Sequence, residues 1–532
     1  MKRRNFIQHA AGALIGTQLW GLYACNAPEL SSNVTTTADF LFEEMTIDQM
    51  QAGFTAGEFS VESVVKAYLL RIQQLDQAGP KVNSIIEVNP EAKEIAKQLD
   101  QELKDGKSRG PLHGIPIVLK DNIDTHDKMM TTAGSRALLD SRPLQDSWVA
   151  ANLREAGAVI LGKANLSEWA NFRSNISSSG WSGRGGQTKN PYVIDRNPCG
   201  SSAGSGAAVS ANFCMLAIGT ETNGSIVCPS HANGIVGIKP TVGLVSRAGI
   251  IPISETQDTA GPMARTLKDA VICLGALTGV DERDEKTATS ETKSYTDYTQ
   301  FLNREGLKGK KIGLYTRALG FHQKVDELIE NAAALMEKQG AEVVRIDKIG
   351  SGDGGRDSFQ IMLYEFKDGL NKYFASLGPD APIKNLEELI AFNKQDSIES
   401  SFDQDLLELA QEKAGLDSPE YQALLDKMLK NTREKGLDEA IATHELDAII
   451  APTGSAAWKT DPINGDHFLG GSSSPAARAG YPNITVPMGW VEELPVGISF
   501  FGGAWTEPLL IEIAYAYEQA SMHRKAPTFI ES

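Results

Sequence analysis

The serine at position 225 could act as a nucleophile, because it stands between a glycine and small apolar residues in GTETNGSIVCPS (219–230). A serine hydroxyl alone is a weak nucleophile at neutral pH, so a base must take its proton. The nearest histidine in the sequence is His231. Lys120 ends the apolar run IPIVL (115–119), where loss of solvent would favour its neutral amine. Taken alone, that lysine fits equally well as a surface residue at a strand end.

Two short motifs resemble those of other serine enzymes but lack the partners that such enzymes need. SVVK (63–66) matches S-x-x-K, yet it lies in an amphipathic helical stretch and no S-D-N or K-T-G follows. GSSAG (200–204) matches G-x-S-x-G, but Pro198 stands where a nucleophile elbow needs a strand. An elbow would also need a later acid and histidine, for which the candidates are Asp447, His467 and His523. The same glycine-rich run lacks the spacing of a phosphate-binding loop.

The composition limits the classes of partner and the chemistry of the cysteines. The 532 residues are 41% hydrophobic and carry a net charge of −17, which argues against nucleic acid or an anionic membrane surface as a partner. The five cysteines form no CxxC pair and no metal-type spacing with histidine. Four of them lie in or near apolar, small-residue stretches, which predicts free thiols rather than a disulfide: Cys199, Cys214, Cys228 and Cys273.

The N-terminus has the pattern of an export signal. Lys2, Arg3 and Arg4 precede a modestly apolar stretch, so residues 1–24 are predicted to be a signal peptide with a twin-arginine-like start. The order LYAC (22–25) resembles a bacterial lipobox, which predicts lipidation of Cys25; the alternative is a plain cleaved signal. Residues 25–40 are polar and fit a flexible tether. We therefore expect an exported bacterial protein, either periplasmic or membrane-anchored.

Hydrophobic periodicity predicts an α/β fold with one large mixed β-sheet, helices on both faces and a helical insertion. Helices are expected at 61–75, 146–156, 324–338 and 508–519, and strands at 114–119, 158–162, 310–315, 342–346, 446–452, 483–489 and 496–502. Residues 355–440 are charged and helical in period, so we interpret them as the insertion within a single domain over 41–532. The glycine- and serine-rich stretch 171–206 predicts a long functional loop.

Several blocks in the same order are similar to the amidase signature family. They are GIPIVLKDNID, GKANLSEWA, GSSAGSGAAVS, GTETNGSIVCPS, GIVGIKPTVGLVS and QDTAGPMARTLKDA, with a similarity running from about residue 45 to 525. The resemblance implies a serine amidohydrolase with Ser225 as nucleophile, Ser201 as proton relay after a cis peptide bond, and Lys120 as base. It also implies backbone oxyanion donors at Thr222, Asn223 and Gly224, and no metal or cofactor.

Other residues have separate interpretations beside that resemblance. Asn171, Phe172 and Trp181, in the long loop before Ser201, are candidates for the pocket wall, with buried packing as the alternative. Asp258 and Arg265 resemble a structural pair of the family near the sheet.

Within the family, WANFRSN, SGWSGRGGQTKNP and CPSHANGIVG are most similar to the bacterial peptide amidases. That similarity implies a monomer that hydrolyses the C-terminal carboxamide of peptides to free acid and ammonia. Three alternatives remain at this point: an amidase for small, aryl or fatty amides, the glutaminase subunit of a tRNA-dependent amidotransferase, and an exported solute-binding lipoprotein without catalysis.

Overall fold

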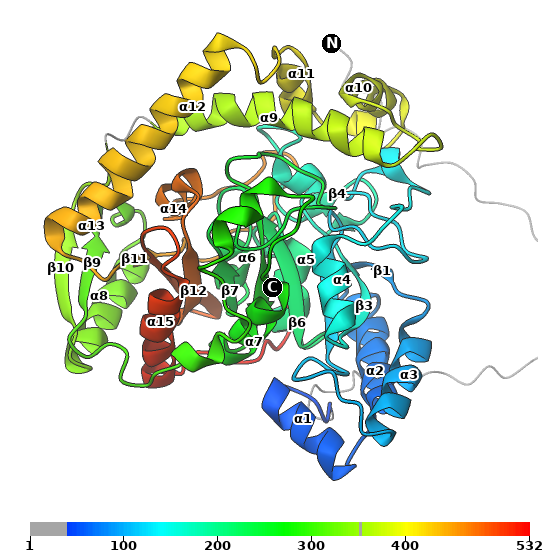
Figure 1. Ribbon diagram of the computed structural model, residues 1–532, viewed down its shortest axis with the longest axis horizontal. Coiled ribbons are helices and arrows are strands. Elements are labelled where there is room, and N and C mark those ends of the chain that lie inside the picture. Colours follow the sequence, from blue (N-terminus) through cyan, green and yellow to red (C-terminus); the bar gives the residue numbers. More distant parts are fainter. Residues whose placement is uncertain (1–39, 351–353, 532) are drawn as a thin grey trace, which may run out of the picture. The chain divides into compact units, whose positions relative to one another are not determined.

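The computed structural model describes residues 40–350 and 354–531, and its centre is one mixed sheet of eleven strands (Figure 1). The predicted signal peptide, Cys25 and nearly all of the predicted tether lie outside the described residues. In spatial order the strands are β1 (Ile85–Val88), β3 (Val159–Ala164), β2 (Pro116–Lys120), β6 (Leu216–Glu221), β8 (Thr259–Ala264), β7 (Val236–Lys239), β12 (Asn483–Val491), β13 (Leu494–Phe501), β11 (Ala448–Pro452), β9 (Lys311–Tyr315) and β10 (Glu342–Ile346).

The direction of pairing changes along the sheet. Strands β3, β2 and β6 run parallel, as do β11, β9 and β10, whereas the pairs from β6 through β8, β7, β12 and β13 to β11 are antiparallel. The strands that carry the candidate lysine and lead to Ser225, β2 and β6, are direct neighbours. Their residues are buried throughout, which is why the sequence shows continuous apolar runs there.

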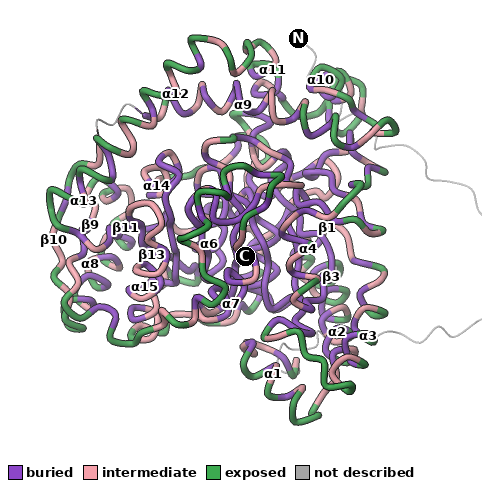
Figure 2. Tube along the Cα trace, viewed as in Figure 1, coloured by how far each residue is buried: buried purple, intermediate pink, exposed green. Residues whose placement is uncertain are grey.

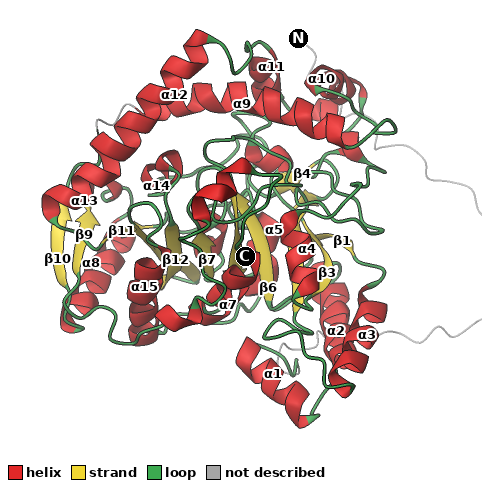
Figure 3. Ribbon diagram, in the orientation of Figure 1, coloured by secondary structure: helices red, strands yellow, loops and turns green. Residues whose placement is uncertain are grey.

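Two groups of helices pack on the sheet (Figure 3). The short helices α5 (Ala203–Ser210) and α6 (Val227–Ala232) contact each other, and they follow the two candidate serines. A second group packs on β8 and β12, namely α7 (Leu267–Leu277), α8 (Gln323–Lys338) and α15 (Glu507–Ser521). The other helices outside the insertion are α1 (Ile47–Ala56), α2 (Val61–Arg71), α3 (Ala92–Lys104), α4 (Trp148–Glu155) and α14 (Ser474–Ala479).

The predicted insertion is helical. It contains α9 (Gly354–Ser376), α10 (Leu386–Gln395), α11 (Asp405–Gln411), α12 (Pro419–Thr432) and α13 (Asp438–His444). Helices α9 to α12 run along the upper side in Figure 1, and α13 lies at the left. The outward faces of the insertion are exposed, while the central strands of the sheet and the segments after them are buried (Figure 2). Residues from Phe40 onward form one compact unit, and no helix of the described residues is long and apolar enough to cross a membrane.

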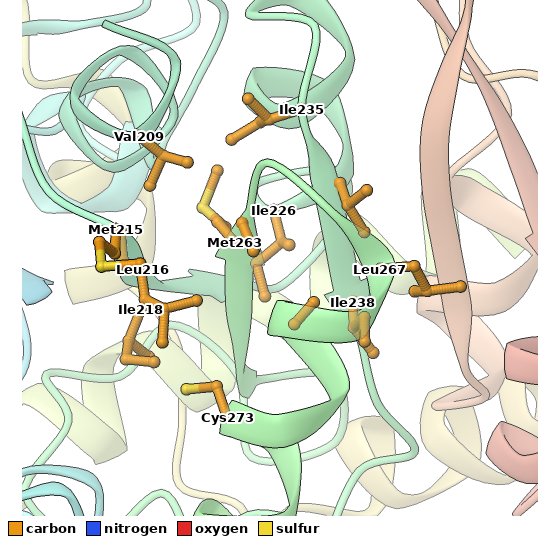
Figure 4. Packing of buried hydrophobic residues seen from close by; sticks show 14 of the residues in the cluster. Val209, Met215, Leu216, Ile218, Ile226, Ile235, Ile238, Met263, Leu267 and Cys273 are labelled. Carbon is orange, nitrogen blue, oxygen red and sulfur yellow. The ribbon is translucent and has the colours of Figure 1, made fainter. Parts of the chain in front are cut away.

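Figure 4 shows how the core holds the segment that contains Ser225. Ile226, the next residue, directs its side chain into a buried cluster with Val209, Ile218 and Met263. Because Ile226 is fully buried, its burial contributes about 2–3 kcal/mol to anchoring this short loop. The Ser225 backbone is therefore fixed from the core side.

Candidate active site

Lys120, the last residue of β2, is fully buried and reaches the candidate relay serine. Its Nζ lies 2.8 Å from Ser201 Oγ, 2.8 Å from Thr220 Oγ1 and 3.2 Å from the Thr220 carbonyl oxygen. Thr220 belongs to β6, so neighbouring strands fix the amine against Ser201. The predicted contact between Lys120 and Ser201 is observed.

The environment of Lys120 favours its uncharged form. Burial lowers the pKa of Lys120 from its usual 10.5 to about 7, although the charges of Asp258 and Glu221 oppose that shift. Since an unperturbed lysine is almost wholly protonated at neutral pH, only a shift of this kind makes the amine available as a base. The site can therefore support proton transfer to a lysine near pH 7.

Ser201 follows a cis Gly200–Ser201 peptide bond, as the family resemblance implies. Its carbonyl accepts a hydrogen bond from the Ser167 N–H at 3.0 Å. A Cβ at position 200 would lie 2.2 Å from Ser167 Oγ, so only glycine fits there. The surrounding loop thus holds Ser201 on both sides, and α5 begins two residues later.

Ser225 lies in the turn between β6 and α6, beside the Ser201 segment. The Ser202 N–H donates to the Ser225 carbonyl at 3.2 Å, which joins the two segments directly. The Ser225 residue is 9% exposed, and its hydroxyl makes no hydrogen bond to any residue that the structure describes. Its hydroxyl is therefore uncommitted, and the transfer of its proton to Ser201 remains a prediction.

Glu221 organises the turn that carries Ser225. Its buried carboxylate accepts hydrogen bonds from the N–H groups of Gly224 and Ile226, both at 2.8 Å, and of Val227 at 3.1 Å. Three backbone N–H groups are thereby satisfied by one side chain. This role of Glu221 was not predicted from the sequence, although a charged residue at the end of an apolar strand, directly before a glycine turn, is a signal for it.

The backbone N–H groups of this turn divide into two kinds. Gly224, one of the three predicted oxyanion donors, already donates to Glu221, which argues against that assignment. The N–H groups of Thr222, Asn223 and Ser225 make no hydrogen bond within the described part of the chain. These three remain available to a developing negative charge.

Asn223 and Thr222 are held by their side chains. Ser473 Oγ donates to Asn223 Oδ1 at 2.7 Å, so the segment before α14 forms a further side of the site. Thr222 Oγ1 donates to Asp258 Oδ1 at 2.5 Å. Arg265 binds the backbone carbonyls of Cys214 and Met45, which fits the structural role that the family resemblance implies for it, and no hydrogen bond joins it to Asp258 in the described residues.

The predicted pocket residues separate into different environments. Phe172 is buried and packs on Phe366 with ring centroids 5.0 Å apart, so it joins the insertion to the domain rather than forming the predicted pocket wall. Asn171 accepts a hydrogen bond from Ser177 Oγ at 2.9 Å. Trp181 stacks on Phe402 of the insertion, with centroids 3.7 Å apart.

Trp181 and Phe402 line a small surface cleft with Ile176, Ser178 and Pro462, which we call the outer cleft. The residue after Ser178, Ser179, lies against Gly200. The loop that lines the outer cleft therefore also contacts the residue before Ser201. A separate cavity of about 410 Å³ reaches Thr220 and Thr222 from the side of α9.

The prediction of free thiols is wrong for two cysteines. Cys199 and Cys228 form a disulfide with Cα atoms 5.9 Å apart, whereas Cys214 and Cys273 are free and buried. Sequence spacing alone does not show this pair, because α5 and β6 lie between the two residues and bring them together only in the fold. Closing a loop across 29 positions stabilises the folded state by about 3–4 kcal/mol.

Within residues 40–350 and 354–531, no group of three or more His, Cys, Asp or Glu side chains could hold a metal ion. The nearby His231 is fully buried, and burial lowers its pKa to about 3. Since neither ring nitrogen has a partner in the described residues, His231 is not placed as the base for Ser225. The candidate chemistry therefore depends on the lysine and the two serines.

Comparison with known proteins agrees with this geometry. A family model described as Amidase matches residues 63–511. The chain belongs to the amidase signature family. The amidase is 40% identical over 513 residues to a probable amidase of Arabidopsis thaliana, covering 94% of each chain. It is 33% identical to a glutamyl-tRNA(Gln) amidotransferase subunit of Halorhodospira halophila, covering 92% of this chain and 100% of that one.

Solved structures show the same fold. The amidase superposes on the native peptide amidase from Stenotrophomonas maltophilia with a TM-score of 0.88 and 50% identity, covering 92% of this chain and 99% of that one. An amidase family protein from Bacillus anthracis gives a TM-score of 0.82 at 40% identity, covering 91% and 92%. The predicted fold class is confirmed, and the protein is an amide-hydrolysing enzyme.

Proposed function

We propose that this amidase cleaves the C-terminal carboxamide of peptides with Ser225 as nucleophile, Ser201 as proton relay and Lys120 as base. The observation that carries the proposal is the 2.8 Å contact of a buried Lys120 amine with Ser201 Oγ, beside a Ser225 hydroxyl without a partner in the described residues. A hydroxyl both donates and accepts, so Ser201 can pass a proton from Ser225 to the lysine.

The reaction would proceed in two halves. Ser225 Oγ attacks the amide carbon while its proton moves through Ser201 to neutral Lys120. The free N–H groups of Thr222, Asn223 and Ser225 face the oxyanion, and each such donor typically contributes about 3–4 kcal/mol to transition-state stabilisation. Protonated Lys120 returns the proton through Ser201 to the leaving nitrogen, which departs as ammonia. Water then hydrolyses the acyl-enzyme by the same path.

Two observations support a peptide amide as the substrate. The solved peptide amidase from Stenotrophomonas maltophilia is 50% identical to this chain. The outer cleft, lined by a loop that also contacts the residue before Ser201, offers aromatic and aliphatic surface from Trp181, Phe402 and Ile176, where an upstream side chain could lie. If the site is closed on the side that receives the leaving group, the NH₂ of a carboxamide fits there, whereas a further amino-acid residue of a longer peptide does not.

The experiment compares four substrates by release of ammonia and free acid: a blocked dipeptide amide, the same peptide extended by one residue, free glutamine and a long-chain fatty amide. We expect the dipeptide amide to be hydrolysed fastest and the extended peptide to remain intact. Faster hydrolysis of the fatty amide or of glutamine would leave the family unchanged but contradict the substrate class. No turnover of any amide would instead favour the solute-binding alternative.

We also propose that the enzyme acts outside the cytoplasm, anchored through Cys25. The Arg3-Arg4 pair and the lipobox-like LYAC support export. The Cys199–Cys228 disulfide is independent support, because such bonds persist in oxidising compartments. Cys25→Ser should release the enzyme from membranes, and Arg3→Lys with Arg4→Lys should leave it in the cytoplasm. Release of unaltered enzyme by high salt without detergent would contradict the anchor.

A monomer is the expected state in solution. Light scattering coupled to size-exclusion chromatography tests it: one chain has a mass of 57.3 kDa. A mass of twice that value would contradict the expectation.

A further inference from the structure

The Cys199–Cys228 disulfide connects the two segments that carry the candidate serines. Cys199 stands just before Gly200 and Ser201, and Cys228 lies in the first turn of α6, just after Ser225. The bond therefore crosses from the start of one serine segment to the end of the other. The disulfide thus links the backbone segments of Ser225 and Ser201, the two residues between which a proton must move.

Among the described residues, the other contacts between these segments are non-covalent, and they include the two hydrogen bonds of Ser202 Oγ with the N–H and carbonyl of Thr220 near the end of β6. The Ser202 N–H donates to the Ser225 carbonyl at 3.2 Å, and the Asn233 side chain after α6 donates to the Pro198 carbonyl at 2.9 Å. Such hydrogen bonds exchange readily with water when a loop opens. A covalent bond keeps the two segments in register through such openings.

Ser225 depends on its backbone for its position. Its hydroxyl has no hydrogen bond to the described residues, so no side-chain contact aims it at Ser201. Glu221, the last residue of β6, fixes the turn before and after Ser225. Its neighbour Thr220 is hydrogen-bonded to Ser202, so on this side the turn is joined to the Ser201 segment by non-covalent contacts. The disulfide supplies the missing covalent link, and Cys199 lies with Ala232 and Trp458 in a small buried cluster.

We propose that the Cys199–Cys228 disulfide is a positioning device that keeps the Ser225 backbone beside the Ser201 segment, so that the Ser225 hydroxyl can turn to Ser201 for proton transfer. The inference rests on the proposed serine–lysine function. Proton transfer needs donor and acceptor within about 2.6–3.2 Å, and a displacement near 1 Å can cost about 100-fold in rate. Loss of the bond should slow the chemical step and leave the binding surface in the outer cleft intact.

The main test is the double variant Cys199→Ser with Cys228→Ser, assayed on a peptide amide at a temperature where circular dichroism shows it folded. We expect kcat to fall about 10-fold or more while KM changes by less than about twofold. The rate of covalent labelling by a fluorophosphonate should fall by a similar factor, because labelling needs the same activated Ser225. If the bond were purely stabilising, its loss would lower the melting temperature and change neither rate.

Reduction of the unaltered enzyme gives a second, independent measurement. Reductant should lower kcat in step with the appearance of two new thiols, and re-oxidation should restore it. The double variant should not respond to reductant. The matched control Cys214→Ala with Cys273→Ala removes only free buried thiols, so it should keep both its kcat and its sensitivity to reductant.

Retention of kcat within about twofold in the folded double variant, or a rise in KM alone, would overturn the proposal. If the double variant does not fold, the reduced and still folded unaltered enzyme decides by the same criteria. Failure of the proposed function looks different: Ser225→Ala would then keep its activity with the disulfide intact.

Discussion

The serine–lysine group (Lys120, Ser201 and Ser225) and the outer cleft are built in opposite ways. The serine–lysine group lies at the ends of buried central strands and is held by Thr220, Glu221 and the disulfide. The outer cleft is lined by loop residues and by Phe402 of the insertion, which is 36% exposed. A rigid scaffold can position the chemistry while exposed loops set what binds. Changes in the first region should act on kcat, and changes in the second on KM.

The largest expected effect is that of Ser225→Ala, which removes the nucleophile without altering the fold. We expect kcat to fall by about 10⁶-fold, as for nucleophiles of other serine hydrolases. Lys120→Ala should cost about 10²–10⁴-fold, the usual contribution of a general base. Lys66→Ala is the matched control, because Lys66 is exposed on α2 and forms an ion pair with Glu62. Substantial turnover by Ser225→Ala, with purity checked, would rule out the nucleophile.

Glu221→Gln should have the next largest effect, because it keeps the shape but places an N–H₂ group against backbone N–H donors. Disturbing the turn should lower kcat by about 100-fold, similar to the loss of one oxyanion donor. Glu507→Gln is the control: Glu507 is also a buried carboxylate that accepts a backbone N–H, that of Thr241 at 2.6 Å, but it is the first residue of α15 and not part of the turn that carries Ser225. Equal losses of kcat in both variants would mean that Glu221 acts only through stability.

The serine–lysine group and the outer cleft also differ in how well the sequence predicts them. Continuous apolar runs in the sequence predict strands β2, β9 and β11 to β13. The family motifs predict that Lys120 and Ser201 belong to the site. The pairing of Cys199 with Cys228, the packing of Phe172 and the Arg265 contacts with Cys214 and Met45 depend on which distant segments meet. The Trp181–Phe402 stack joins residues from the long loop and the insertion. Local periodicity carries no information on such contacts, so the outer cleft could not be predicted.

The pH dependence should report Lys120. Its neutral amine is the active base, so kcat/KM should rise with pH and level off above the pKa of about 7 that burial gives it. Below that value, protonated Lys120 cannot accept the proton, and activity should fall about tenfold per pH unit. A profile of kcat/KM against pH for a peptide amide measures this. A plateau that extends unchanged down to pH 5 would contradict a lysine base.

The smallest expected effect is that of Trp181→Ala in the outer cleft. Losing the Trp181 ring from the wall of the outer cleft should raise KM for a dipeptide amide about tenfold, because an aromatic contact between that ring and an upstream side chain of the substrate would contribute about 1 kcal/mol or slightly more. The value of kcat should change little. A small amide without an upstream residue is the control substrate and should be unaffected. A fall in kcat with unchanged KM would mean that the outer cleft acts on the chemical step, which would contradict the separate roles of the outer cleft and the serine–lysine group.

Covalent labelling by a fluorophosphonate, followed by mass spectrometry of the digested protein, tests the central claim most directly. The account predicts a single adduct on Ser225, formed rapidly in the unaltered enzyme and lost in Ser225→Ala. It also predicts much slower labelling of Ser225 in Lys120→Ala, because the base is missing. An adduct on Ser201 or another residue, or equally fast labelling of Ser225 without Lys120, would contradict it.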